Sequence, residues 1–262
     1  MALFNDGLIN QQQDLANYEN GILDVASAEQ IDLDGKSALA QSEIGLQILA
    51  LLLRRETRSP LLTWNCGQDT TRRQTGVNDV VVTDGLRQWH AMRTLAAVYR
   101  DAYNNQLNDR YMKKWQEYLK LEQDARDLLY ETGIGLSTFW LPSPAAPVLT
   151  FVPGSGVSAQ YFVQVTWVNQ TGQESAPSQQ SQLNTAPGTQ LVITAPGNAP
   201  QYATGWNAYA GTSPGSMSLQ NSTPLTLGAA WTMPGNLVTG QPSGAGQTPD
   251  RYVTDDHVLP RG

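Results

Sequence analysis

The chain has 262 residues, a formal net charge of −7, two histidines and a single cysteine. This acidic balance argues against a general nucleic-acid-binding surface, which requires clustered Lys and Arg. The lone cysteine, Cys66, excludes an internal disulfide and fits a reducing compartment. With two histidines and one cysteine, the available ligands argue against a zinc site.

No segment has the length or composition of a membrane helix or a signal peptide. The longest apolar run, Ile48–Leu53, has six residues, whereas a membrane helix needs roughly 20. The first 25 residues contain neither an apolar run nor a basic start. We therefore expect a soluble protein, made in the cytoplasm, that contacts no membrane and needs no metal or cofactor.

The charges are distributed unevenly, which predicts more than one domain. Residues 1–140 hold 14 of the 16 Lys and Arg and 19 of the 23 Asp and Glu, whereas the remainder is rich in small and polar residues. One continuous core would rarely change composition so sharply. The predicted parts are an N-terminal arm (1–26), a helical bundle of three to four helices (27–140), a Pro-rich linker (141–147), a β-sandwich (148–240) and an extended C-terminal tail (241–262).

The first part begins with a weakly patterned polar stretch, residues 1–26, which is typical of a surface arm. A helix is predicted from about Ser37, a suitable N-cap, to Arg55. Apolar residues wrap most of the way round this helix, which predicts contacts to a neighbouring subunit as well as to its own domain. The charged connection over 57–83 has a length that is usual for functional or disordered loops.

The strongest pattern is a helical hairpin over Asp84–Glu131, with a polar turn at Asn104–Asn108. Apolar and aromatic residues recur three and four positions apart, so each helix presents one stripe to the other. The stripes consist of Trp89, Met92, Ala96, Tyr99 and Tyr103, and of Leu107, Tyr111, Trp115, Tyr118, Leu121, Ala125 and Leu128. Their aromatic members fit either a ligand groove or a packed core, and the core is the favoured interpretation.

After Pro142, Pro144 and Pro147 the hydrophobic period changes to two. Strands are predicted over 161–168, 190–194 and 205–210, and shorter ones near 217–220, 225–227 and 230–233. Short strands separated by frequent turns indicate a β-sandwich, and the missing disulfide makes it closer to a fibronectin type III domain than to an antibody domain. The tryptophans of this part, Trp167, Trp206 and Trp231, are interpreted as core, with a sugar-binding platform as the alternative.

The last residues combine aromatic, apolar and basic side chains on a stretch that is otherwise rich in Gly and Pro. A pure spacer would not need this mixture, so the tail is our candidate for binding a partner protein. The candidate residues are Arg251, Tyr252, Val253, His257, Val258, Leu259 and Arg261.

No catalytic constellation is evident, and we expect the protein not to be an enzyme. Glu117 with Glu122, or Asp124 with Asp127, could supply the paired carboxylates of a glycoside hydrolase. Solvated ion pairs with nearby Lys and Arg are the favoured interpretation. His90, beside Trp89, is interpreted as a hydrogen-bonded residue of a helix surface or interface.

The helical part resembles the head-to-tail adaptor (connector) proteins of tailed bacteriophages over roughly residues 27–135. The resemblance is carried by Leu86-Arg87-Gln88-Trp89-His90, by Leu95-Ala96-Ala97-Val98-Tyr99-Arg100-Asp101-Ala102 and by Trp115-Gln116-Glu117-Tyr118. The β-part is similar to immunoglobulin-like or fibronectin-like modules of phage structural proteins. Here the resemblance is carried by 163–169, 172–178 and 205–209.

The resemblance implies a structural protein of the virion neck, assembled in the host cytoplasm. Such adaptors form a ring, usually of twelve subunits, between the portal protein and the tail nozzle, tube or fibre proteins. DNA passes through the ring without sequence-specific binding, and an acidic wall suits that passage. This chain differs from the simplest adaptors because a β-domain precedes the tail that would reach the portal. The alternatives are a carbohydrate-binding or adhesion module on a helical stalk, and a cell-wall hydrolase.

Overall fold

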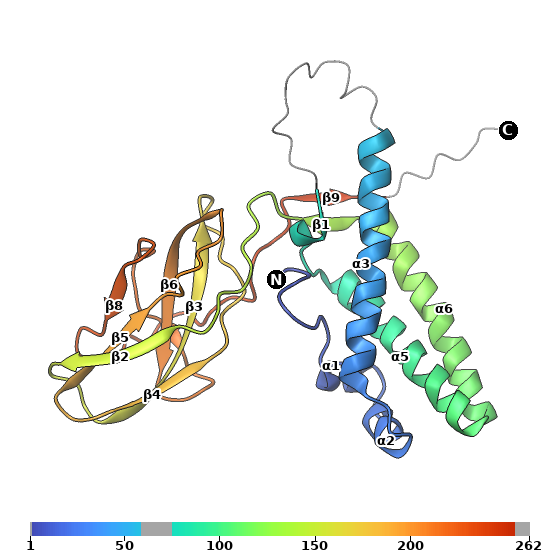
Figure 1. Cartoon of the computed structure of the whole chain (residues 1–262), viewed down its shortest axis with the longest axis horizontal. Coiled ribbons are helices and arrows are strands. Elements are labelled where there is room, and N and C mark those ends of the chain that lie inside the picture. Colours follow the sequence, from blue (N-terminus) through green and yellow to red (C-terminus); the bar gives the residue numbers. More distant parts are fainter. Residues whose placement is uncertain (1, 59–74, 255–262) are drawn as a thin grey trace. The chain divides into compact units, whose positions relative to one another are not determined.

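The computed structural model describes residues 2–58 and 75–254 (Figure 1). In these residues five α-helices precede a series of antiparallel sheets, which confirms the predicted order of α before β. The chain divides into two compact units. The helical unit comprises Gly7–Leu136 and Pro249–Gly262, and the β unit comprises Met1–Asp6 and Ser137–Thr248.

The helical unit contains all five α-helices. They are α1 (Gln12–Tyr18), α2 (Ile22–Ala28), α3 (Leu33–Arg58), α5 (Asp84–Gln106) and α6 (Asp109–Thr132), and a 3-10 turn, η1 (Val77–Asp79), precedes α5. The structure differs from the predicted N-terminal arm (1–26), because α1 forms within it and α2 begins within it and ends at Ala28. Each is only seven residues long and is anchored by one large buried side chain, Leu15 or Ile22, so the sequence shows little helical periodicity.

The hairpin is confirmed, since α5 and α6 cover the predicted range. Leu107 ends α5 in the left-handed conformation with φ 52°, and the Asn108 side chain accepts a hydrogen bond from the Arg110 N–H at the start of α6. α5 is the central helix, because it packs against both α6 and α3 (Figure 1). Its buried residues therefore lie on more than one side, whereas α3 keeps an exposed face.

A two-stranded sheet completes the helical unit. β1 (Ile134–Leu136) pairs antiparallel with β9 (Arg251–Val253). Gly133 ends α6 with φ 102°, and a Cβ there would lie only 2.9 Å from the Cβ of Tyr252. Residues 251–253 thus differ from the expected extended tail, because their backbone is paired with a strand more than 100 positions earlier.

The β unit contains two antiparallel sheets. Its strands are β2 (Val148–Pro153), β3 (Ala159–Asn169), β4 (Ser181–Thr185), β5 (Thr189–Thr194), β6 (Ala203–Gly211), β7 (Ser218–Leu219) and β8 (Ala230–Thr232). The strand orders are β2-β5-β8 and β4-β3-β6-β7. The predicted strands over 161–168, 190–194 and 205–210 are confirmed as β3, β5 and β6. The strand predicted near 225–227 is wrong in extent, because only Leu225 forms a bridge, to Trp206.

One hydrophobic core joins the inner faces of the two sheets. It includes Trp167 and Trp206 from one sheet and Leu191, Ile193 and Trp231 from the other. Segments outside the strands also belong to this unit. Leu141, within the predicted linker, is buried and donates its N–H to Gln247 Oε1. The N-terminus is tied in by Asp6, which accepts the N–H groups of Leu3 and Ser143.

In the described part of the chain, no helix is both long enough and apolar enough to cross a membrane.

Candidate functional site

The predicted partner-binding residues fall into two groups. Arg251, Tyr252 and Val253 form β9 in the helical unit, and the Arg251 guanidinium donates to Thr75 Oγ1 at 3.1 Å. His257, Val258, Leu259 and Arg261 lie outside the described residues. The structure therefore brings the first three together at the end of the helical unit that is built from β1 and β9.

A row of leucines on α3 forms the first exposed apolar feature of the helical unit. Leu39, Leu46 and Leu53 are 45%, 66% and 38% exposed. They lie seven residues apart, the spacing at which one helix face meets a second helix in knobs-into-holes packing. We call these three residues the α3 leucine row. The described part of the helical unit leaves more than a third of each of these three side chains exposed.

α6 carries a shorter row of the same kind. Leu121 and Leu128, again seven residues apart, are 40% and 53% exposed. The sequence-based assignment of these two leucines to the stripe facing α5 is wrong, as is that of Leu107, which ends α5 and is 71% exposed. The buried α6 positions are Tyr118, Glu122, Ala125 and Leu129, which turn Leu121 and Leu128 outward. We call Leu121 and Leu128 the α6 leucine row.

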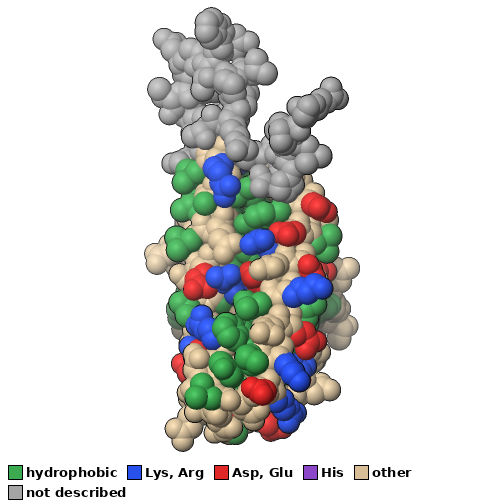
Figure 2. Space-filling view, turned by 90° about the vertical axis from the view of Figure 1, so that its right-hand side faces the viewer, with side chains coloured by type: hydrophobic (Ala, Val, Ile, Leu, Met, Phe, Trp, Pro, Cys, Tyr) green, Lys and Arg blue, Asp and Glu red, His purple; other side chains and the backbone are tan. Residues whose placement is uncertain are grey.

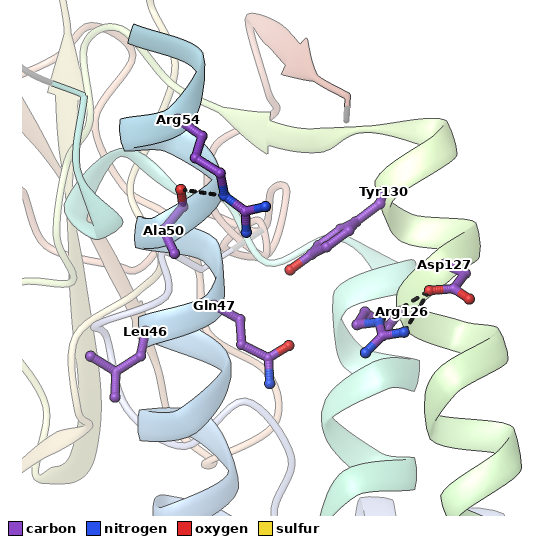
Figure 3. A pocket seen from close by; sticks show the side chains of 7 residues that line it. All are labelled: Leu46, Gln47, Ala50, Arg54, Arg126, Asp127 and Tyr130. Atoms are coloured by element: carbon purple, nitrogen blue, oxygen red, sulfur yellow. Dashed lines mark hydrogen bonds and ion pairs between the residues drawn. The ribbon is translucent and has the colours of Figure 1, made fainter. Parts of the chain in front are cut away.

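An open groove of about 430 Å³ lies between α3 and α6 (Figure 3). Side chains from both helices project into or border it. Its lining residues are Leu46, Gln47, Ala50 and Arg54 from α3, and Arg126, Asp127 and Tyr130 from α6. Figure 2 shows hydrophobic and charged side chains interleaved over one face of the molecule. A mixed lining of this kind suits a helix of another protein chain better than a small apolar ligand.

A polar link through α5 holds α3 and α6 at their separation. The Arg93 guanidinium donates to Glu43 Oε2 of α3 at 2.8 Å and to Glu122 Oε1 of α6 at 2.9 Å. The buried Trp89 indole donates to the same Glu122 oxygen at 2.9 Å. Glu122 is therefore a buried acceptor and not a solvated ion-pair residue, while Glu117 is exposed beside Lys114, as expected.

His90 is fully buried in a second polar network. Its Nδ1 accepts from Asn10 Nδ2 at 2.9 Å, and its Nε2 donates to the Ser37 carbonyl at 3.0 Å. Asn10 also donates to the Arg87 carbonyl. Burial lowers the pKa of His90 from 6.5 to about 4, although the bond to Ser37 opposes this shift. The neutral imidazole of His90, on α5, therefore hydrogen-bonds both to the segment before α1 and to α3. His90 thus lies at the interface between these three segments of the helical unit.

This network predicts acid sensitivity of the helical unit. The unfolded chain binds a proton at His90 below pH 6.5, but the folded chain does so only below about pH 4. The contribution to stability is complete above pH 6.5 and falls by roughly 3 kcal/mol as the pH drops to 4. Denaturant titrations of wild type and His90→Gln at several pH values check this. In His257→Gln, which removes the other histidine, the free energy of unfolding should fall between pH 6.5 and 4 as steeply as in the wild type. In His90→Gln it should fall less steeply, and an equally steep fall would contradict the assignment.

Half of the aromatic stripe of the hairpin packs as core, whereas Tyr103, Tyr111 and Trp115 are half-buried. Trp89, Tyr99 and Tyr118 are buried, and the Tyr99 and Tyr118 rings stack with centroids 5.5 Å apart. The Tyr118 hydroxyl donates to Glu19, which also pairs with Lys114 at 2.9 Å. Burial would raise the pKa of Glu19, but these two hydrogen bonds outweigh it and hold the pKa below its ordinary value. The segment between α1 and α2 thus covers the stripe at Tyr118.

The sugar-binding alternative for the β unit required Trp206 or Trp231 on the surface. They are 0% and 8% exposed and belong to the core, so this interpretation of the tryptophans is wrong. Among the residues that the structure describes, no three His, Cys, Asp or Glu side chains gather as metal ligands would.

No protein-family model matches the sequence, and a search of curated proteins finds no match either.

Proposed function

We propose that this chain is a head-to-tail adaptor of a tailed bacteriophage, whose helical unit forms a ring between portal and tail. The observation that carries the proposal is the pair of exposed leucine rows on α3 and α6. They lie on a helical unit whose sequence resembles such adaptors. The ring belongs to the virion neck, and DNA passes through it without sequence-specific binding.

Two different apolar rows favour a ring over a two-fold dimer. A cyclic ring needs a heterologous contact, in which one patch of each subunit meets a different patch of its neighbour. The α3 leucine row spans about 21 Å of helix axis at 1.5 Å per residue. It can receive the shorter α6 leucine row, because both have the same seven-residue spacing. The groove between the helices supplies polar partners beside this contact.

Mass measurement tests this proposal. Light scattering of the purified protein, alone and mixed with the portal protein of the same virus, should give a particle of about 340 kDa for a ring of twelve, against 28.5 kDa for one chain. The ring number follows from the resemblance alone, so another closed ring is also compatible. A strict monomer under both conditions would overturn the proposal.

The C-terminal end is the proposed contact with the portal, and it needs a truncation that spares the fold. Removing everything from Asp250 onward would delete β9 and expose β1, because the Asp250 N–H also donates to the Leu136 carbonyl. Deleting 255–262 keeps β9. This shorter truncation should abolish co-sedimentation with the portal while leaving the far-ultraviolet circular dichroism spectrum unchanged. Undiminished co-sedimentation would reject the tail as the portal contact.

For the β unit, we propose a fibronectin-like or immunoglobulin-like sandwich that faces tail nozzle, tube or fibre proteins. The support is the single core between a three-stranded and a four-stranded antiparallel sheet. For the helical unit, we propose that the α3, α5 and α6 helices act as the adaptor bundle, with α1 and α2 packed against α5.

A further inference from the structure

β2 is an unusually apolar edge strand of its sheet (Figure 1). Val148, Phe151 and Val152 are 59%, 58% and 39% exposed. Edge strands normally carry charged residues or bulges that prevent pairing with another chain. Val148–Pro153 carries no charge, and its pairing with β5 runs through all six residues without a bulge.

The hydrogen-bond directions show which backbone groups of β2 face outward. The Gly154 N–H donates to the Gly188 carbonyl at 2.8 Å, on the β5 side. Because directions alternate along an antiparallel strand, Thr150 also faces β5, whereas Leu149 and Phe151 direct their N–H and C=O groups away from β5. Pro153 occupies an outward position where its missing N–H costs nothing. The outward Pro147 carbonyl accepts from Ser181 Oγ at 3.0 Å, so the start of β4 lies beside the start of β2 on this side.

We infer that β2 pairs antiparallel with β2 of a second copy of this chain, with Thr150 opposite Thr150. In this register Val148 faces Val152 of the second copy, and Leu149 faces Phe151. Each Leu149–Phe151 pair exchanges two backbone hydrogen bonds, because both residues direct their groups outward. The prolines at 147 and 153 meet at both ends, where neither can donate, and they limit the pairing to the five residues between them.

The charge of the β unit favours a second copy as the occupant. In residues 2–6 and 137–248 the charged side chains are Asp6 and Glu174, with no Lys or Arg. Glu174 is occupied by hydrogen bonds from Thr166, Asn207 and Tyr209. Such a surface offers little attraction to a charged partner, and two copies approach without repulsion. A contact this small is weak in isolation, and it does not depend on the proposed ring.

Single cysteines test the register directly. The full chain is used with Cys66→Ser, to remove the native thiol, and Leu46→Lys, to disable the proposed ring contact. In a non-hydrogen-bonded pair the Cα atoms lie about 4.5 Å apart, within disulfide range. Thr150→Cys should therefore give a disulfide-linked dimer on mild oxidation. Val148→Cys and Val152→Cys should link when mixed but only poorly when each is alone.

The matched control is Thr232→Cys. Thr232 is exposed on β8, the edge strand on the other side of the same sheet. It should stay monomeric. Equal linking of Thr150→Cys and Thr232→Cys would mean random collision, and no linking of Thr150→Cys would mean no pairing; either result overturns the inference.

Charge substitutions give a second measurement that needs no oxidation. Thr150→Lys or Thr150→Glu should each weaken self-association in sedimentation equilibrium by roughly tenfold, because like charges face each other at the centre. An equimolar mixture of the two should restore it. If an added strand of a different protein is the true occupant, the mixture behaves like either variant alone, which contradicts self-pairing.

Discussion

Replacing Glu122 with alanine is expected to lower the free energy of unfolding of the helical unit by about 3 kcal/mol. Glu122 Oε1 accepts from the buried Trp89 indole and from the Arg93 guanidinium. Alanine leaves both donors without this acceptor, and the Trp89 N–H lies where water does not reach. The polar link between α3 and α6 also loses one of its two carboxylates.

The matched control is Glu117→Ala on the same helix. Glu117 is exposed and lies 3.7 Å from Lys114 in an i,i+3 pair, so its loss should cost less than about 0.5 kcal/mol. The loss of unfolding free energy in Glu122→Gln should lie between those of the two alanine variants. An amide oxygen still accepts from Trp89, but it lacks the negative charge that pairs with Arg93. Urea denaturation followed by tryptophan fluorescence measures all three. An unchanged stability in Glu122→Ala would contradict the structural role and revive the paired-carboxylate interpretation.

The second large effect concerns assembly. Leu46→Lys should dissociate the ring into folded monomers, a loss of roughly 3 kcal/mol per contact, because a lysine at the centre of the α3 leucine row would have to be buried without a partner. Leu128→Lys should do the same from the other side of the contact. Gln123→Lys, an exposed α6 position outside the row, adds the same charge and should leave the ring intact.

Mixing the two variants separates a heterologous contact from a two-fold one. A Leu46→Lys subunit keeps its α6 leucine row, and a Leu128→Lys subunit keeps its α3 leucine row. Together they can form one contact between two unaltered leucine rows, but they cannot form a closed ring. Light scattering of the mixture should therefore find dimers of about 57 kDa, twice the 28.5 kDa of the chain. If α3 instead contacts α3 of a second copy, Leu128→Lys alone would keep the wild-type mass.

The sequence predicts the elements whose side chains repeat with one period over many residues. The α5–α6 hairpin and β3 are such elements, since each carries a long apolar pattern. The same pattern misplaced Leu121 and Leu128, because α6 has leucines or aromatics on more of its circumference than α5 covers. Periodicity says that a face is apolar, and contacts decide which apolar face is buried.

Pairings between distant segments could not be predicted from local pattern. β9 has three residues, two of them exposed, and it is a strand only because β1 binds it. His90 meets Asn10 across 80 positions, and Lys114 meets Glu19 across 95. Neither contact can be detected from residues that are close in the sequence. The sequence alone therefore predicts a polar arm for the N-terminal segment. Three of the seven tail residues proposed to bind a partner could therefore be assigned to a folded strand only with the structure.

Electron microscopy of the purified full chain tests the central claim most directly. Negative-stain class averages, with the portal protein present where the chain alone does not assemble, should show closed rings with a central opening. The same preparation of Leu46→Lys should show none. Particles that remain monomeric in both preparations, or that form open filaments in place of rings, would contradict an adaptor ring built from the α3 and α6 leucine rows.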